Sequence, residues 1–191
     1  TDMSLLFASC APGESIINNA AEEPEVDDLI ELINTLGGSA ERVEPRRIKI
    51  EGTKQFTGGT FSVQPDRNEV VTYAVGALVT KGNITIKGVN RGHLLSFVNI
   101  LTKLDAKFEI NGDEMRVWSA KRDLNTTDIA TAPYPGVMTD WQPLLTLLLS
   151  HIEGESYIHD TIYWDRFGYT VDLNRMGAKI ELVSPTEAGY D

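Results

Sequence analysis

Helix-like and strand-like patterns of apolar residues follow one another along this chain, most clearly in its middle third. Residues 68–80 are apolar on nearly every side, which predicts a buried helix. Residues 94–104 carry their apolar side chains on one stripe, which predicts an amphipathic helix. Residues 60–64 and 83–89 have the character of strands. The middle of the chain therefore predicts two strands, each followed by a helix.

The same succession of patterns occurs three times. Gly13, Gly82 and Gly154 each begin a strand-like segment, and they are spaced by about 70 residues. An apolar helix precedes this strand in each copy, and a second helix follows it. The middle copy closes with a hairpin at Asn111-Gly112, whose residues both tolerate positive φ. We predict three copies of one strand-helix-strand-helix-strand-strand unit, with the first and last copies truncated.

Units of this kind predict a mixed α/β fold with helices packed inside a shell of sheets. Two of the apolar helices begin at polar clusters, residues 66–69 and 139–140. If the copies are related by rotation, these helix N-termini converge on one anion-binding cleft. The remaining predicted elements are an apolar helix from Met3, a second helix from Pro24, strands at 40–44, 47–51, 128–132 and 178–183, and helices at 141–152 and 166–176.

One carboxylate stands between a Pro/Gly-rich loop and an apolar helix. The loop occupies residues 131–138, and Asp140 comes just before the apolar run that starts at Pro143. Proline is tolerated in a first helical turn, so we predict Asp140, rather than Thr139, as the N-cap. Asp140 has two interpretations: it only caps the helix, or it also faces a cleft at a helix N-terminus, where anionic ligands bind.

Composition narrows the class of protein. The chain has 191 residues with 41% hydrophobic and 24% charged side chains, which suits one large or two small soluble domains. A net charge of −11 disfavours nucleic acid as a partner, and no apolar run is long enough to span a membrane. Cys10 stands alone, which predicts a core thiol and suits a reducing cytoplasm. The histidines lack metal-ligand spacing, so we predict no metal site.

Four motifs, taken together and in order, resemble one known family. They are Asn18–Glu25 (NNAAEEPE), Gln64–Glu69 (QPDRNE), Ala132–Asp140 (APYPGVMTD) and Asp165–Phe167 (DRF). The chain resembles the UDP-N-acetylglucosamine 1-carboxyvinyltransferases, also called enolpyruvyl transferases, from Thr1 to about Val183. The resemblance implies the enolpyruvyl transferase fold, an inside-out α/β barrel. It also implies that residues 1–59 end one domain of that fold and that residues 60–191 form most of a second.

The resemblance implies an enzyme and its substrates. Members of that family transfer the enolpyruvyl group of phosphoenolpyruvate to the 3′-hydroxyl of UDP-N-acetylglucosamine, the first committed step of bacterial peptidoglycan synthesis. No cofactor is implied, and a cytoplasmic location is. The family's lysine, mobile cysteine loop and late arginines have no counterpart in this chain, so we expect a fragment of a longer protein that is inactive alone and able to self-associate.

The resemblance also assigns roles to residues of the third copy. Asp140 matches the aspartate that binds the UDP-sugar and is proposed to take the proton from the attacking hydroxyl. Ile162 matches a backbone contact to the nucleotide sugar, and Arg166 matches an arginine near the sugar diphosphate. The alternative for Arg166 is an ion pair with Asp165.

A second group of matched residues lies at the start of the buried middle helix. Asp66, Arg67 and Glu69 correspond to a cluster that lines the cleft. The alternatives are an ion pair between Arg67 and Asp66, and a favourable interaction of Glu69 with the helix dipole.

Two other functions remain open at this point. The sister enzyme acts on shikimate 3-phosphate within the same fold, but the NNAA and AP-x-P motifs favour the UDP-sugar enzyme. The other alternative is a non-catalytic paralogue that binds a nucleotide sugar. Glu22, Trp141 and the segment Tyr163–Asp165 depart from the family's usual residues, which indicates a divergent branch of the family.

Overall fold

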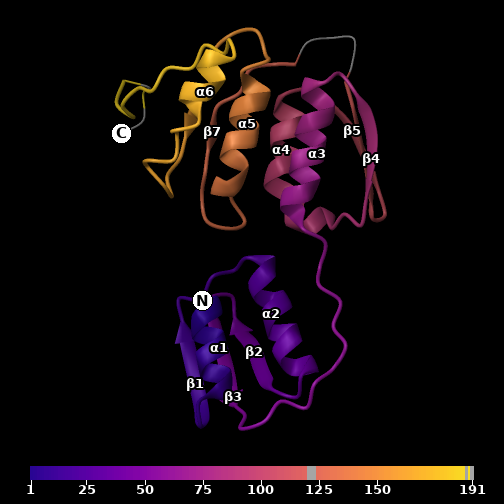
Figure 1. Ribbon diagram of the computed structural model, residues 1–191, viewed down its shortest axis with the longest axis vertical. Helices are drawn as coiled ribbons and strands as arrows, with labels where there is room; N and C mark the ends of the chain where they lie inside the picture. Colours follow the sequence, from indigo (N-terminus) through magenta and orange to yellow (C-terminus); the bar gives the residue numbers. More distant parts are fainter. Residues whose placement is uncertain (120–123, 188, 190–191) are drawn as a thin grey trace. The chain divides into compact units, whose positions relative to one another are not determined.

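The computed structural model describes residues 1–119, 124–187 and 189, and it divides the chain into two compact units (Figure 1). Unit 1 is Thr1–Gln64 and unit 2 is Pro65–Asp191. The predicted boundary after Gly59 lies in the same segment without helix or strand, residues 53–66. The assignment of residues 1–59 and 60–191 to two domains of the enolpyruvyl transferase fold stays a prediction. No helix in the described part of the chain is long and apolar enough to cross a membrane.

Unit 1 is a small antiparallel sheet covered by helices. The sheet has three strands in the order β1-β3-β2, and its register pairs Ile17 with Ile48. A single apolar cluster forms its core, with Leu5, Ile48 and Ile50 fully buried. The elements are α1 (Asp2–Cys10), β1 (Gly13–Asn18), α2 (Pro24–Thr35), β2 (Ser39–Glu44) and β3 (Arg47–Gly52).

The two helices of unit 1 differ in how far their apolar residues are buried. In α2 the buried side chains recur at helical spacing, and Pro24 begins the helix where a missing N–H costs nothing. In α1 only Leu5 and Ser9 are buried, while Met3 and Phe7 are exposed. The predicted apolar helix from Met3 is formed, but only one face of it is buried, because α1 packs that face on the sheet. Cys10 is exposed, so the predicted core thiol is wrong too.

Unit 2 begins with the same order of elements. Its three-stranded sheet has the order β4-β6-β5, which matches β1-β3-β2 position for position. The strands β5 and β6 form the predicted hairpin, and Gly112 adopts a positive φ of 61° in its turn. The elements are α3 (Arg67–Val79), β4 (Asn83–Lys87), the 3-10 helix η1 (Arg91–Leu94), α4 (Leu95–Lys103), β5 (Lys107–Asn111) and β6 (Glu114–Trp118).

The rest of unit 2 is a shorter strand-helix-strand-helix segment. Its strands β7 and β8 pair in parallel, with Ile129 opposite Ile158. The last helix is held to α5 by a 2.7 Å hydrogen bond from the Tyr169 hydroxyl to Thr146 Oγ1. The elements are β7 (Ile129–Ala130), the 3-10 helix η2 (Thr139–Trp141), α5 (Gln142–Leu149), β8 (Ile158–His159) and α6 (Thr170–Arg175).

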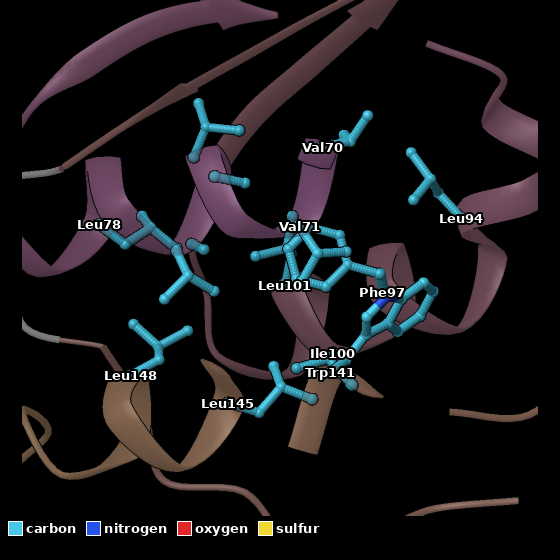
Figure 2. Packing of buried hydrophobic residues seen from close by; sticks show 14 of the residues in the cluster. Val70, Val71, Leu78, Leu94, Phe97, Ile100, Leu101, Trp141, Leu145 and Leu148 are labelled. Carbon is cyan, nitrogen blue, oxygen red and sulfur yellow. The ribbon is translucent and has the colours of Figure 1, made fainter. Parts of the chain in front are cut away.

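The core of unit 2 lies between three helices, α3, α4 and α5 (Figure 2). Trp141, at the start of α5, is fully buried, and its ring meets the edge of Phe97 from α4 with centroids 6.0 Å apart. Val71 and Leu101 pack close by from α3 and α4. The apolar character of residues 68–80 is explained by this arrangement, because α3 is covered by its own sheet and by α5.

Two predicted strands are not formed. Residues 60–64 have no ladder partner in the described chain, and the backbone N–H of Gln64 bonds to the Asp28 side chain at 3.4 Å instead. Residues 178–183 are also without strand structure. There the Asn174 side chain satisfies Ile180, accepting from its N–H at 2.9 Å and donating to its carbonyl at 2.8 Å. Strand-like composition gave no strand because a ladder also needs a neighbouring strand.

The prediction of Asp140 as an N-cap is wrong. The helix is preceded by the 3-10 turn η2, whose N-cap is Met138, and Asp140 lies inside that turn. Pro143 does fall in the first turn of α5, as expected. The Asp140 carboxylate is therefore not used to cap the helix.

Candidate functional site

A cavity open to solvent, of about 690 Å³, lies where two loops of unit 2 face each other. One wall is the start of η2, and the other is the loop from β8 to α6. The loop that leads from β7 into η2 is held in place by two hydrogen bonds. Ala132 N donates to the Val137 carbonyl at 2.9 Å, and Ser96 Oγ from α4 donates to the Gly136 carbonyl at 3.0 Å. The lining residues are Thr139, Asp140, Ile162, Tyr163, Trp164, Asp165 and Arg166.

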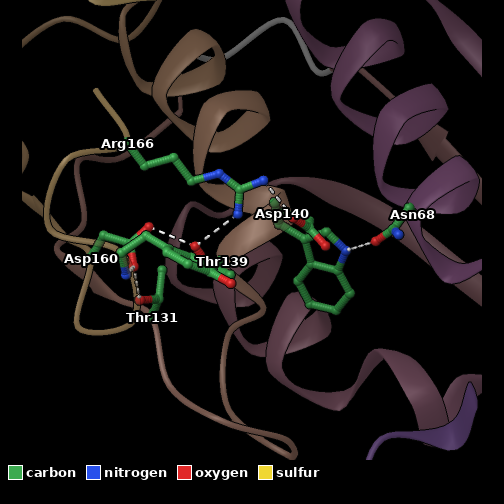
Figure 3. A network of polar contacts seen from close by, with 8 residues as sticks. Asn68, Thr131, Thr139, Asp140, Asp160 and Arg166 are labelled. Carbon is green, nitrogen blue, oxygen red and sulfur yellow. Dashed lines mark hydrogen bonds and ion pairs between the residues drawn. The ribbon is translucent and has the colours of Figure 1, made fainter. Parts of the chain in front are cut away.

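Arg166 joins the two walls of this cavity (Figure 3). Its Nη2 donates to Asp140 Oδ1 at 2.6 Å, and its Nη1 donates to Thr139 Oγ1 at 3.1 Å. The guanidinium also lies over the Tyr163 ring, 5.5 Å from its centre. The sequence offered Asp165 as an alternative partner for Arg166, whereas the structure pairs Arg166 with Asp140.

The structure thus brings together three residues that the sequence singled out, Asp140, Ile162 and Arg166. Asp140 and Arg166 are both partly exposed, so their ion pair adds little to stability. What it provides is a carboxylate acceptor and a cation side by side on the wall of a cavity. Such a wall suits a ligand that offers a hydroxyl group and an anionic group together.

Asp160 is a polar residue of this region that the sequence analysis missed. Its side chain is only 5% exposed. Oδ1 accepts hydrogen bonds from Thr131 Oγ1 at 2.8 Å and from the N–H groups of Ile162 and Tyr163, and Oδ2 accepts from Thr139 Oγ1 at 2.7 Å. A signal for Asp160 was available in the sequence, because it comes directly after β8. Its carboxylate there meets Thr131, at the end of the parallel strand β7.

Burial by itself would raise the pKa of Asp160. The hydrogen bonds from Thr139, Tyr163, Ile162 and Thr131 stabilise the charged form and outweigh burial, so the pKa lies below its usual value. Asp160 therefore stabilises the fold above the unfolded-state pKa of about 3.9, and this contribution is lost as the pH falls through the folded-state pKa.

The pH dependence of unfolding tests this assignment. At pH 7 we expect Asp160→Asn to lower the free energy of unfolding of unit 2 by about 2–3 kcal/mol, because charged hydrogen bonds are lost. The difference from wild type should shrink below about pH 4. Urea unfolding at pH 7, 5 and 3 can be followed by tryptophan fluorescence, since all three tryptophans lie in unit 2. An equal difference at pH 5 and pH 3 would contradict the assignment.

The start of α3 lies beside η2 but does not line the cavity. Asp66 is the N-cap of α3 and accepts from the Asn68 N–H at 2.7 Å. Asn68 Oδ1 in turn accepts from Trp141 Nε1 at 2.8 Å (Figure 3). The helices α3 and α5 thus begin at the same end of unit 2 (Figure 1), in agreement with the predicted convergence of their N-termini.

Arg67 occupies a different environment from that of Arg166. It is 4% exposed, and its guanidinium lies 5.3 Å from the centre of the Tyr134 ring and 5.7 Å from that of Trp141. Glu69 is exposed in the first turn of α3. Neither residue lines the cavity, and nor does Asp66, so their predicted role in the cleft stays a prediction.

No group of three or more metal-ligating side chains is found within residues 1–119, 124–187 and 189.

Comparison with known proteins shows the family to which the chain belongs. The family model of EPSP synthase (3-phosphoshikimate 1-carboxyvinyltransferase) matches residues 1–187. The chain belongs to the EPSP synthase family. Within it, the chain is 37% identical over 182 residues to UDP-N-acetylglucosamine 1-carboxyvinyltransferase 2 of Clostridium tetani, with 95% of this chain and 43% of the relative covered. It is also 37% identical to the UDP-N-acetylglucosamine 1-carboxyvinyltransferase of Paramagnetospirillum magneticum, with 95% and 42% covered.

This member of the EPSP synthase family therefore spans less than half the length of those relatives. Among solved structures, it is similar to the enolpyruvyl transferase NikO from Streptomyces tendae. The TM-score is 0.84 at 23% identity, with 95% of this chain and 43% of that chain covered. This similarity confirms the predicted enolpyruvyl transferase fold, whereas the division of the fold into repeats rests on the order of the elements alone.

Proposed function

We propose that the protein containing this chain transfers the enolpyruvyl group of phosphoenolpyruvate to the 3′-hydroxyl of UDP-N-acetylglucosamine. The observation that carries the proposal is the pair of Asp140 and Arg166 on the wall of one open cavity. The relatives named for this reaction support it, because the similarity to them covers nearly the whole chain.

Asp140 has the role of base in this proposal. In the transfer, the sugar oxygen bonds to C2 of the enolpyruvyl group, the bond from C2 to the phosphate oxygen breaks, and phosphate leaves. The hydroxyl proton passes to a carboxylate within hydrogen-bond reach. Arg166 bonds to Oδ1 of Asp140, and we assign the other carboxylate oxygen to the sugar hydroxyl.

The remaining contacts follow from the two walls of the cavity. Arg166 supplies the positive charge for the sugar diphosphate, and the backbone of Ile162, from the same loop between β8 and α6, contacts the nucleotide sugar. Asp66, Arg67 and Glu69 contribute to the wall of the cleft from the start of α3. The burial of Arg67 between two rings favours an indirect, structural contribution of this residue over direct contact with the ligand.

The wider context belongs to the same proposal. The reaction commits UDP-N-acetylglucosamine to peptidoglycan, and with it to cell wall biogenesis, cell shape and cell division, in the cytoplasm. Residues 1–59 end one enolpyruvyl transferase domain, and residues 60–191 form most of another. Exposed apolar side chains such as Phe7 and Trp164 favour self-association of the 191-residue chain.

The first test is calorimetric titration of UDP-N-acetylglucosamine into the protein at its full natural length. We expect binding by wild type and affinity weaker by about 10–100-fold in Asp140→Ala, because a charged hydrogen bond is lost. Asp172→Ala, which removes an exposed carboxylate from α6, is the matched control and should bind like wild type.

The same titration with shikimate 3-phosphate distinguishes the sister reaction. Binding of shikimate 3-phosphate in place of the UDP-sugar by the folded full-length protein would show that the acceptor is assigned wrongly. Equal affinity of wild type and Asp140→Ala for UDP-N-acetylglucosamine would remove Asp140 from the site.

A further inference from the structure

A continuous series of hydrogen bonds links the buried carboxylate of Asp160 to the exposed one of Asp140 (Figure 3). Thr139 Oγ1 donates to Asp160 Oδ2 at 2.7 Å. The same oxygen accepts from Arg166 Nη1 at 3.1 Å, and Arg166 Nη2 donates to Asp140 Oδ1 at 2.6 Å. Three bonds therefore connect a residue outside the cavity lining to the two charged groups on its wall.

The direction of the Thr139 hydrogen bonds is set by Asp160. A hydroxyl carries one proton, and an ionised carboxylate can only accept. Since the Thr139 proton is given to Asp160, the lone pairs of Oγ1 are the groups that Thr139 presents to Arg166. The guanidinium has no acceptor, so this orientation of Thr139 is the one that can hold Arg166.

Asp160 is itself rigidly held. The side chain is 5% exposed, and Oδ1 accepts from Thr131 at the end of β7 and from two backbone N–H groups of the loop that carries Ile162. A buried charge with its hydrogen bonds satisfied keeps one geometry. Asp160 thus ties the loop of one cavity wall to the hydroxyl of the other.

We propose that Asp160 is a positioning residue, which fixes the Arg166 guanidinium through Thr139 so that Arg166 and Asp140 meet the phosphate and hydroxyl groups of a nucleoside diphosphate sugar. The identity of that ligand rests on the function proposed above. The positioning of Arg166 rests only on the contacts of this chain.

The test is Asp160→Asn in the full-length protein. The Asn oxygen can still accept from Thr131 and from the backbone of Ile162 and Tyr163, so the loop is retained. The new amide donates towards Thr139 and reverses the hydrogen bond at Oγ1. Asp128→Asn is the matched control. Asp128 also links the segments that lead into β7 and β8, because it accepts a hydrogen bond from the Tyr157 N–H at 2.9 Å, but it lies outside the series of bonds that reaches Arg166.

Two measurements decide the outcome. Without ligand, the Arg166 guanidinium protons, observed by 15N NMR, should exchange with solvent faster in Asp160→Asn than in wild type or Asp128→Asn. In calorimetry with UDP-N-acetylglucosamine, Asp160→Asn should weaken affinity by about 10-fold, and it should have little further effect in a Thr139→Val background, because the two variants break one connection.

Unchanged guanidinium exchange in a folded Asp160→Asn protein would overturn the positioning role, as would fully additive losses of affinity in the double variant. A wild-type protein that binds no UDP-N-acetylglucosamine would instead overturn the proposed function, and the exchange measurement would still decide the role of Asp160.

Discussion

Replacing Trp141 with alanine should lower the free energy of unfolding of unit 2 by about 3–5 kcal/mol, the cost of removing a large aromatic side chain from a packed core. Trp141 is fully buried and packs edge-on against Phe97. Its Nε1 donates to Asn68, so the change also leaves a half-buried amide oxygen of α3 without this donor. The start of α5 would then lose its attachment to the start of α3.

Urea unfolding followed by tryptophan fluorescence measures this effect, because the two remaining tryptophans still report on unit 2. Trp164→Ala is the matched control. It removes the same side chain from a position that is 88% exposed, and it should change stability by no more than about 0.5 kcal/mol. Equal unfolding midpoints for the two variants would show that Trp141 does not hold the helices of unit 2 together.

Helical periodicity predicted α3 and α4 well because burial is repeated along these two helices. The apolar residues of 68–80, with the exception of the exposed Tyr73, and the stripe of 94–104 face the core of unit 2. The hairpin was predictable from Asn111-Gly112 because a turn is local. The strands predicted at 60–64 and 178–183 are not formed, for the opposite reason. A strand needs a partner strand elsewhere in the chain, and the composition of the segment itself does not specify that partner.

The candidate site was predictable through the resemblance and less so from the residues themselves. Asp140, Ile162 and Arg166 lie together, but the partner of Arg166 was open between interpretations until the structure showed Asp140. The capping rule put Asp140 at the wrong position because a 3-10 turn precedes α5. Asp160 escaped notice because its importance comes from four donors on three segments of the chain, two of which lie more than 20 residues away from it in the sequence.

The second large effect on stability is expected in unit 1, where a single carbon atom added to Gly52 would clash with the backbone. Gly52 ends β3, where the strand passes the end of α1. A Cβ on Gly52 would lie 1.5 Å from the Ala11 carbonyl oxygen and 3.0 Å from that of Ala8. Both obstacles are backbone atoms, so the clash cannot be relieved by rotating a side chain. The Thr53 N–H also donates to the Ser9 carbonyl at 2.9 Å, which holds the two segments at this distance.

Gly52→Ala is therefore expected to destabilise unit 1 by about 3 kcal/mol, at the upper end of the cost of overpacking. Unit 1 contains neither tryptophan nor tyrosine, so hydrogen exchange by mass spectrometry is the suitable measurement. The peptide that covers β3 should lose protection, while peptides from β4 and β6 keep theirs and serve as an internal reference.

Gly76→Ala separates this clash from the general effect of adding a methyl group to a glycine. Gly76 lies inside α3, and a Cβ added there would meet no atom of another part of the chain within 4 Å, so alanine should stabilise the helix by about 0.5–1 kcal/mol. Unchanged protection of β3 in Gly52→Ala would mean that α1 can move away from the sheet at little cost. The contact of α1 with the end of β3 would then not be part of what holds unit 1 together.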